Sequence, residues 1–383
     1  MSVSFRSLFT PARIAAFAAV FAFGVIVFGA FVRLSDAGLS CPDWPTCYGK
    51  AAWPGHTEDI AHANAEFPDR PFETGKAWRE QVHRMLAGTL GVLVLALALV
   101  AAWRQRALIV LLALAALCAA CGIFLYTRHD YAISGAFSVF AIALPIIVAT
   151  RLDRPLPWRV AVAVLAVVVF QAMLGMWTVT LLLKPIVVMG HLLGGLLTFS
   201  LLVFVALRLT DRTRPTPDQQ RLRSAVVVGL VLLACQIALG GWTSANYAAL
   251  ACGFDFPQCQ GQWWPPTDFH EGFVLWRGVG VNYEGGVLDA PARAAIQIAH
   301  RIGALVVFCY LGWLAYRLAR VRLRAYGLAI AVLLIAQVVL GVGNVKLGLP
   351  LPVATAHNAV AALLLFALIA ALVRATDPPR ENG

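Results

Sequence analysis

The chain has 383 residues, of which 60% are hydrophobic and 13% charged, and its formal net charge is +11. A soluble protein exposes much of its surface to water and cannot bury this much apolar side chain, so lipid must cover the rest. The basic excess alone would suit a nucleic-acid partner. Its distribution along the chain, described below, excludes that class, and we expect no nucleic-acid partner.

Apolar runs of about 20 residues, the length that crosses a bilayer as a helix, recur along the whole chain. The first run is too long, and too poor in a cleavage motif, for a removable signal peptide. The sequence therefore predicts an all-α membrane protein with about ten spans. We expect them at residues 11–32, 83–103, 107–126, 131–150, 159–182, 186–207, 224–243, 295–316, 327–345 and 353–373.

Basic residues gather in alternate connections between the spans. The clusters are Arg104 and Arg106; Arg151, Arg154 and Arg159; Arg208 to Arg223; and Arg317 to Arg324. Connections rich in arginine and lysine stay in the cytoplasm, so these segments are predicted to be cytoplasmic. An even number of spans then puts both termini in the cytoplasm and the two long cysteine-containing loops on the periplasmic side of a bacterial inner (plasma) membrane.

The cysteines divide in the same way. Cys41 and Cys47 share the first long outer loop, and Cys252 and Cys259 share the second. On the oxidising face of a bacterial membrane such pairs favour two disulfides. The four other cysteines lie inside apolar spans, where a thiol usually acts as a small hydrophobe.

Residues recur at matching spacings in the two halves of the chain, which indicates an internal duplication. The matches are Gly29 to Cys41 with Gly240 to Cys252; Glu80-Gln-Val-His83-Arg84 with Gln297-Ile-Ala-His300-Arg301; and Gln171 to His191 with Gln337 to His357. We therefore predict two tandem four-helix transmembrane bundles in the same orientation, related by an axis along the membrane normal.

The duplication also sets the expected domain limits. The pair of spans at 107–150 has no counterpart in the second half and is predicted to be an inserted transmembrane hairpin. The N-terminal half is then 1–207, the cytoplasmic linker 208–223 and the C-terminal half 224–383.

Four of the eight histidines are expected within the first turns of spans, at the outer membrane edge: His83, His191, His300 and His357. One histidine at a span end is ordinarily an interfacial residue. Four at duplicated positions favour heme iron held by paired imidazoles from facing helices. The pairs would be His83 with His191, and His300 with His357.

Charged residues next to these histidines admit two interpretations each. Arg84 and Arg301 either reach the interface as ordinary long side chains or bind a heme propionate. Glu80 stands where the second half has Gln297, on the same helix face as the histidine. A carboxylate near a membrane is costly unless it is used or paired. We weigh a capping or salt-bridge role against proton handling or cation stabilisation at a reacting heme.

The residues from Val32 to Cys47 (VRLSDAGLSCPDWPTC) carry the strongest motif, and Glu80-x-x-His83-Arg84, Leu174 to Val179 and His191 to Gly194 add to it. Together they closely resemble the heme A synthase family. The resemblance covers essentially the whole chain except 107–150. Members of that family typically have eight spans in two four-helix bundles, so the extra hairpin departs from the pattern.

The resemblance implies that the C8 methyl of heme O is oxidised to a formyl group, giving heme A for cytochrome oxidase. It implies that His83 and His191 hold the substrate heme, that His300 and His357 hold a permanent heme b, and that Glu80 is catalytic. Delivery of heme O by a heme O synthase is expected, together with an electron acceptor that the sequence does not identify.

Two other classes stay open at this stage. A diheme cytochrome b that transfers electrons would also have four span-end histidines, and a heme transporter or chaperone would release its heme unchanged. The loop disulfides are either structural or redox-active in heme delivery. The sequence leaves open the order of heme loading and the oligomeric state, a homo-oligomer included.

Overall fold

The computed structural model describes residues 10–211 and 213–378. The predicted cytoplasmic ends, 1–9 and 379–383, and residue 212 of the predicted linker lie outside the described residues. Nearly all regular structure in the described part is helical. The helices are α2 (Pro11–Leu34), α3 (Thr57–Glu66), α4 (Thr74–Ala101), α5 (Arg106–Thr127), α6 (Tyr131–Arg151), α7 (Leu156–Thr180), α8 (Pro185–Thr210), α9 (Pro217–Arg221), α10 (Arg223–Ala245), α11 (Phe269–Gly272), α12 (Ala290–Arg320), α13 (Arg324–Lys346) and α14 (Leu351–Arg374).

Within the described ranges, ten helical segments are long and apolar enough to cross a membrane, which confirms the expected multi-pass architecture. Two of these helices begin earlier than their apolar runs. The span expected at 83–103 belongs to α4, which starts at Thr74, and the span expected at 295–316 belongs to α12, which starts at Ala290. Ala, Lys, Arg, Glu and Gln are good helix formers, so α4 continues through a polar segment and α12 through an alanine-rich turn that the hydropathy pattern does not assign to a span.

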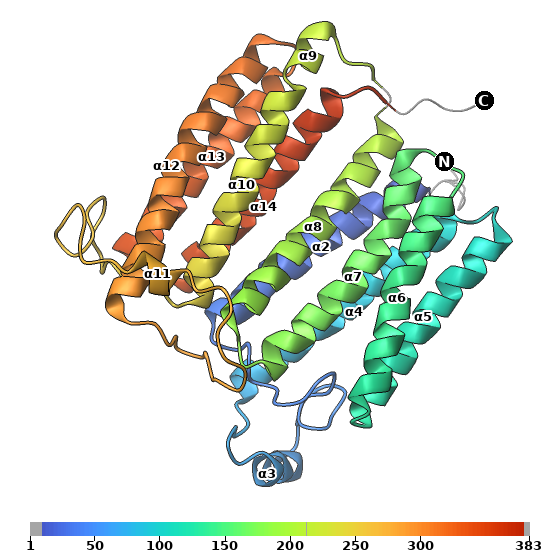
Figure 1. Cartoon of the computed structure of the whole chain (residues 1–383), viewed down its shortest axis with the longest axis vertical. Coiled ribbons are helices and arrows are strands. Elements are labelled where there is room, and N and C mark those ends of the chain that lie inside the picture. Colours follow the sequence, from blue (N-terminus) through green and yellow to red (C-terminus); the bar gives the residue numbers. More distant parts are fainter. Residues whose placement is uncertain (1–9, 212, 379–383) are drawn as a thin grey trace.

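The long helices form two groups of four (Figure 1). In the first group α2, α4, α7 and α8 pack around a common centre, and in the second α10, α12, α13 and α14 do the same. The groups meet where α2 and α8 pack against α10 and α14. Helices α5 and α6 lie outside the first group, with α5 against α4 and α6 against α7.

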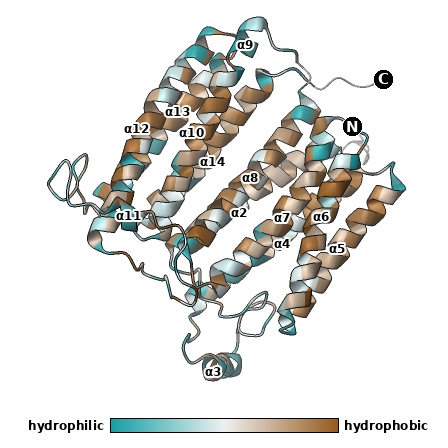
Figure 2. Cartoon of the chain, viewed as in Figure 1, coloured by the Kyte–Doolittle hydropathy of each residue, from teal (hydrophilic) through white to brown (hydrophobic). Residues whose placement is uncertain are grey.

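The long helices consist mainly of hydrophobic residues, and hydrophilic residues are concentrated at the helix ends and in the connections (Figure 2). Many large apolar side chains are exposed on the helix surfaces, for example Val20, Val92 and Leu305. A contiguous apolar exterior of this kind is the surface that hydrocarbon tails cover, so the composition and the exposed faces agree.

Both chain ends lie at one end of the helices and both disulfide loops lie at the other, which we call the loop end (Figure 1). The loop end carries the connections α2–α4, α7–α8, α10–α12 and α13–α14. Arg33, at the end of α2, donates hydrogen bonds to the Tyr247 hydroxyl (3.2 Å) and the Ser244 carbonyl (2.8 Å). The two groups of helices are therefore tied together at the loop end.

Candidate heme site

The four singled-out histidines lie on α4, α8, α12 and α14, all toward the loop end. They are not in the first turns of their helices, as the hydropathy pattern suggested. His83 is preceded by nine residues of α4 and His300 by ten residues of α12, while His191 and His357 each follow six helical residues. The earlier starts of α4 and α12 explain this difference for His83 and His300.

Each of these histidines packs its ring against a glycine of the adjacent helix. The pairs are Gly29 with His83, Gly175 with His191, Gly240 with His300 and Gly341 with His357. A Cβ added to the glycine would lie 2.7, 3.0, 3.2 and 3.1 Å, respectively, from Cε1 of the paired histidine. Any larger residue would push the ring away. These glycines therefore hold each imidazole close to the neighbouring backbone and leave its other side toward the bundle centre.

His83 and His191 face each other across the first group of helices. Their ring centroids are 6.5 Å apart. A metal–imidazole bond is about 2.0–2.1 Å long, so two rings on opposite sides of one metal ion have centroids about 6 Å apart. The pair thus has the separation that a single iron between two imidazoles requires.

Glutamine side chains support three of the four imidazoles. Gln171 Nε2 lies 3.0 Å from His191 Nδ1, Gln236 Nε2 lies 3.0 Å from His300 Nδ1, and Gln337 Nε2 lies 3.1 Å from His357 Nε2. A side-chain contact to one ring nitrogen fixes the orientation of the imidazole ring. The sequence carried a signal for them, because Gln-x-x-x-Gly occurs three times, each ending at one of these glycines. Gln171 and Gln337 mark the internal repeat in the sequence, but their contact with the histidines was not predicted.

His83 is the exception. The residue four positions before Gly29 is Val25, which is buried, and Nδ1 of His83 is buried without a hydrogen-bond partner among the described residues. A ligand without such a support is less firmly oriented. The first site therefore differs from the second in how its histidines are held.

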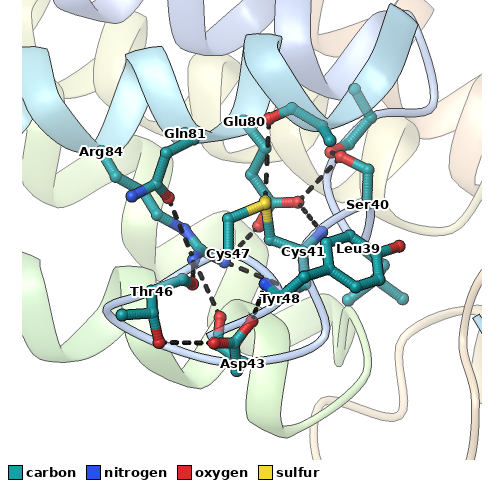
Figure 3. Close-up of a disulfide and its surroundings, with 12 residues drawn as sticks. Leu39, Ser40, Cys41, Asp43, Thr46, Cys47, Tyr48, Glu80, Gln81 and Arg84 are labelled. Carbon is teal, nitrogen blue, oxygen red and sulfur yellow. Dashed lines mark hydrogen bonds and ion pairs between the residues drawn. A yellow bond between two sulfur atoms is a disulfide. The ribbon is translucent and has the colours of Figure 1, made fainter. Parts of the chain in front are cut away.

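Glu80 is buried and both of its oxygens are engaged (Figure 3). Oε1 accepts from the Arg84 guanidinium at 2.5 Å, while Oε2 accepts from the Cys41 amide at 2.8 Å and from the Ser40 hydroxyl at 3.0 Å. The carboxylate therefore fastens the first disulfide loop to α4. In the second half, Oε1 of Gln297 is buried without a hydrogen-bond partner among the described residues.

Arg84 and Arg301 perform matching tasks in the two loops. Arg84 donates to the carbonyls of Asp43 (2.8 Å) and Thr46 (2.7 Å) in addition to Glu80. Arg301 donates to the carbonyls of Gln258 (2.8 Å) and Asp255 (2.9 Å). Both guanidinium groups thus bind loop backbone, and their contact with a heme propionate stays a prediction.

The predicted disulfides are confirmed: Cys41 is bonded to Cys47, and Cys252 to Cys259. The first loop also packs the Tyr48 ring between Phe67 and Phe72 and directs its hydroxyl to the Arg70 carbonyl at 3.0 Å. Burial raises the pKa of Tyr48 to about 12. The loop is therefore a packed structure above the first group of helices.

The other histidines lie apart from the paired ones. His129, in the α5–α6 turn, has its Nδ1 2.9 Å from the Tyr131 hydroxyl, and His62 on α3 lies 3.4 Å from the Glu66 carboxylate. Both are exposed, as is His270. These three histidines are therefore solvent-facing residues outside the paired set.

Comparison with known proteins identifies the family of this chain. Residues 12–127 and 132–369 match the family model COX15-CtaA, described as cytochrome oxidase assembly protein. The chain belongs to this family. The match includes most of α5 and α6, so the expectation that the resemblance excludes residues 107–150 is wrong.

Three similar proteins, each named heme A synthase, align with nearly the full chain. A heme A synthase of Shewanella oneidensis is 41% identical over 353 residues, which are 91% of this chain and 92% of that protein. A heme A synthase of Rhizorhabdus wittichii is 26% identical over 375 residues, and one of Caulobacter vibrioides is 25% identical over 370 residues. These two alignments cover 92% and 91% of this chain, and 90% of each relative.

Proposed function

We propose that this protein is a heme A synthase, an oxidoreductase that converts the C8 methyl of heme O to a formyl group. The observation that carries the proposal is that four histidines, two in each group of helices, each pack against a glycine of an adjacent helix. The chain that contains them belongs to the cytochrome oxidase assembly protein family. Two such pairs suit two hemes, because a helical bundle supplies axial imidazoles from facing helices. The 6.5 Å separation of His83 and His191 supports one iron between them.

We assign the substrate to the first half and a resident heme b to the second. Support comes from the differences between the two sites. His300 and His357 both have glutamine partners, whereas His83 has none among the described residues. A permanent cofactor needs firmly oriented ligands, while a substrate must enter and its product must leave. His83 with His191 is thus the better place for exchange.

When bound, heme b would supply an electron-transfer centre, and the protein's own residues would position the substrate. Turning a methyl into a formyl group removes four electrons from that carbon, so the reaction needs an electron acceptor, which we leave unidentified. Glu80 lies one helical turn from His83 and is held in place by Arg84 and the Cys41 amide. A carboxylate fixed there would stabilise positive charge developing at the oxidised carbon or accept its proton.

The cellular setting belongs to the same proposal. We place the loop end on the periplasmic side of a bacterial inner membrane and both termini in the cytoplasm, because the arginine clusters lie at the opposite end. Heme O then comes from a heme O synthase in the same bilayer, and the product goes to cytochrome oxidase. The disulfides act as structural ties in this proposal, and a homo-oligomer is compatible with it.

The test is conversion of heme O by the purified protein. Hemes are extracted after incubation with heme O and an oxidant and identified by mass. Heme A, or the intermediate alcohol, is expected from the native chain and not from His83→Ala, which should keep the heme b signal. Unchanged heme O with two intact heme signals would favour a diheme cytochrome b. Release of unchanged heme O to an acceptor protein would favour a transporter or chaperone.

A further inference from the structure

Lys184 is a buried cation without an anionic partner among the described residues. It precedes Pro185, the first residue of α8, and its side chain is 1% exposed. Its Nζ lies 3.4 Å from the centroid of the Trp276 ring and has no hydrogen-bond partner among the described residues. A cation–π contact offsets part of the cost of removing an ammonium group from water, but it satisfies none of its three N–H donors. An unpaired buried charge costs several kcal/mol unless something neutralises it.

A loop from the other half covers this lysine. Trp276 and Tyr283 belong to the long connection between α10 and α12, and the Tyr283 amide donates to the Leu182 carbonyl at 3.0 Å. Tyr283 is 1% exposed and packs with Leu183 in one apolar cluster. Bulk water is therefore kept away from the ammonium group, and only a molecule inside the protein can supply its partner.

Arg79 is a second cation without an anionic partner among the described residues, and unlike Lys184 it is only partly buried. It lies on α4, its Nε is buried, and no described residue accepts a hydrogen bond from it or forms an ion pair with it. Its guanidinium lies 5.2 Å from the Phe31 ring centroid. The adjacent Glu80 does not neutralise it, because that carboxylate is bound to Arg84 and to the disulfide loop.

Both cations stand on the loop-end side of the histidine pair. Arg79 precedes His83 by four residues, which is about one helical turn and about 6 Å along α4. Lys184 precedes His191 by seven residues, about two turns and about 10 Å along α8. At these spacings each cation shares a helix face with its histidine.

The second half has no cation at the two matching positions. The residue four positions before His300 is Ile296, and the one seven positions before His357 is Pro350. Ile296 is fully buried in an apolar cluster. A cation at these two positions is therefore a property of the first half and not a general requirement of the fold.

We propose that Arg79 and Lys184 bind the two propionate carboxylates of the heme held by His83 and His191, and so form an anion subsite peculiar to the first half. The proposal rests on the proposed function. A heme carries both carboxylates on one edge, and that edge would point toward the loop end. An arginine fork and a lysine point charge are both suited to carboxylate oxygens. The same contacts would fix which edge of the macrocycle, and hence which methyl, faces the rest of the site.

The experiment compares protoheme with its dimethyl ester, which keeps the macrocycle and loses both negative charges. The first site of the purified full-length protein is emptied with an excess of a heme-scavenging apoprotein and then titrated with either probe. Its signal is defined as the absorbance change that His83→Ala abolishes. The variants are Lys184→Met and Arg79→Ile, the latter giving the second half's residue. The matched controls are Lys346→Met and Arg293→Ile, cations near the loop end of the second half.

A charge-assisted hydrogen bond corresponds to about 10- to 100-fold in affinity. We expect the native first site to prefer protoheme over the ester by at least that factor. Each variant should lower protoheme affinity by that factor and leave ester affinity unchanged, whereas the controls should behave like the native chain. Equal affinities of the native site for the two probes, or variants that weaken both probes equally, would overturn the subsite.

A different result would reject the function itself. If His83→Ala leaves protoheme binding unchanged, or if heme O added to the same native samples yields no oxidised product, the heme A synthase proposal fails. Loss of ester discrimination with normal conversion of heme O would instead leave the function standing and overturn the subsite alone.

Discussion

Replacing Glu80 by glutamine tests whether this carboxylate acts on the chemistry, on the disulfide loop, or on both. The side chains of Glu80 and Arg84 are only 6% and 13% exposed, and Glu80 Oε1 lies 2.5 Å from a terminal nitrogen of the Arg84 guanidinium. Glutamine keeps one acceptor oxygen and loses the charge. We expect the loss of about one charge-assisted hydrogen bond, or about 1.5–3 kcal/mol, from the attachment of the loop to α4.

The assay is the rate at which a reductant opens the Cys41–Cys47 disulfide, measured by alkylation and mass spectrometry. Local opening that is easier by that free energy speeds reduction by about 10- to 100-fold. Cys252–Cys259 in the same molecule is the internal control, because no contact of Glu80 reaches that loop. Heme A formation is read in parallel and should fall by about 10²–10³ if the fixed charge also acts on the reacting carbon.

Ser40→Ala separates the two effects. It removes one donor to Glu80 and leaves the carboxylate charged. If loop opening alone lowers activity, the serine variant should lose activity in proportion to its faster reduction. Gln297→Glu should leave conversion nearly intact. Normal reduction of Cys41–Cys47 together with normal heme A formation in Glu80→Gln would refute both roles.

Three further outcomes follow from the geometry. Gly29→Ala should weaken heme binding at the first site and leave the second site unchanged, because the added Cβ would lie 2.7 Å from the His83 ring and such overpacking costs about 1–3 kcal/mol. Gly24→Ala is the control: with open space around that position, it should leave both optical signals unchanged. Gln236→Leu should lower retention of the second-half heme by about 10- to 100-fold, measured by transfer to a scavenger, and unchanged retention would reject the orienting role. The pKa of Tyr48 is raised above its unfolded value of 10.0 to about 12, so its contribution to loop stability is complete below pH 10 and is lost as the pH rises through 12; an alkaline absorbance titration should show this late step in the native chain and not in Tyr48→Phe.

The sequence by itself determined the spans and the disulfide pairs. Ten apolar segments and two pairs of closely spaced loop cysteines are local features, and the described structure contains both. The duplicated spacing also singled out His83, His191, His300 and His357 as one set. Local patterns were weaker at boundaries, where α4 and α12 begin several residues before their apolar runs.

The tertiary structure alone decided what surrounds those histidines. The amide that binds Glu80 is 39 positions away, and Trp276, which lies over Lys184, comes from the other half of the chain. Such contacts depend on which helices become neighbours and which loop folds over them, and residue spacing along one segment does not encode that. The sequence marks Lys184 only as a charge at a span end. Packing removes it from water and gives it no hydrogen-bond partner in the part of the chain that the structure describes.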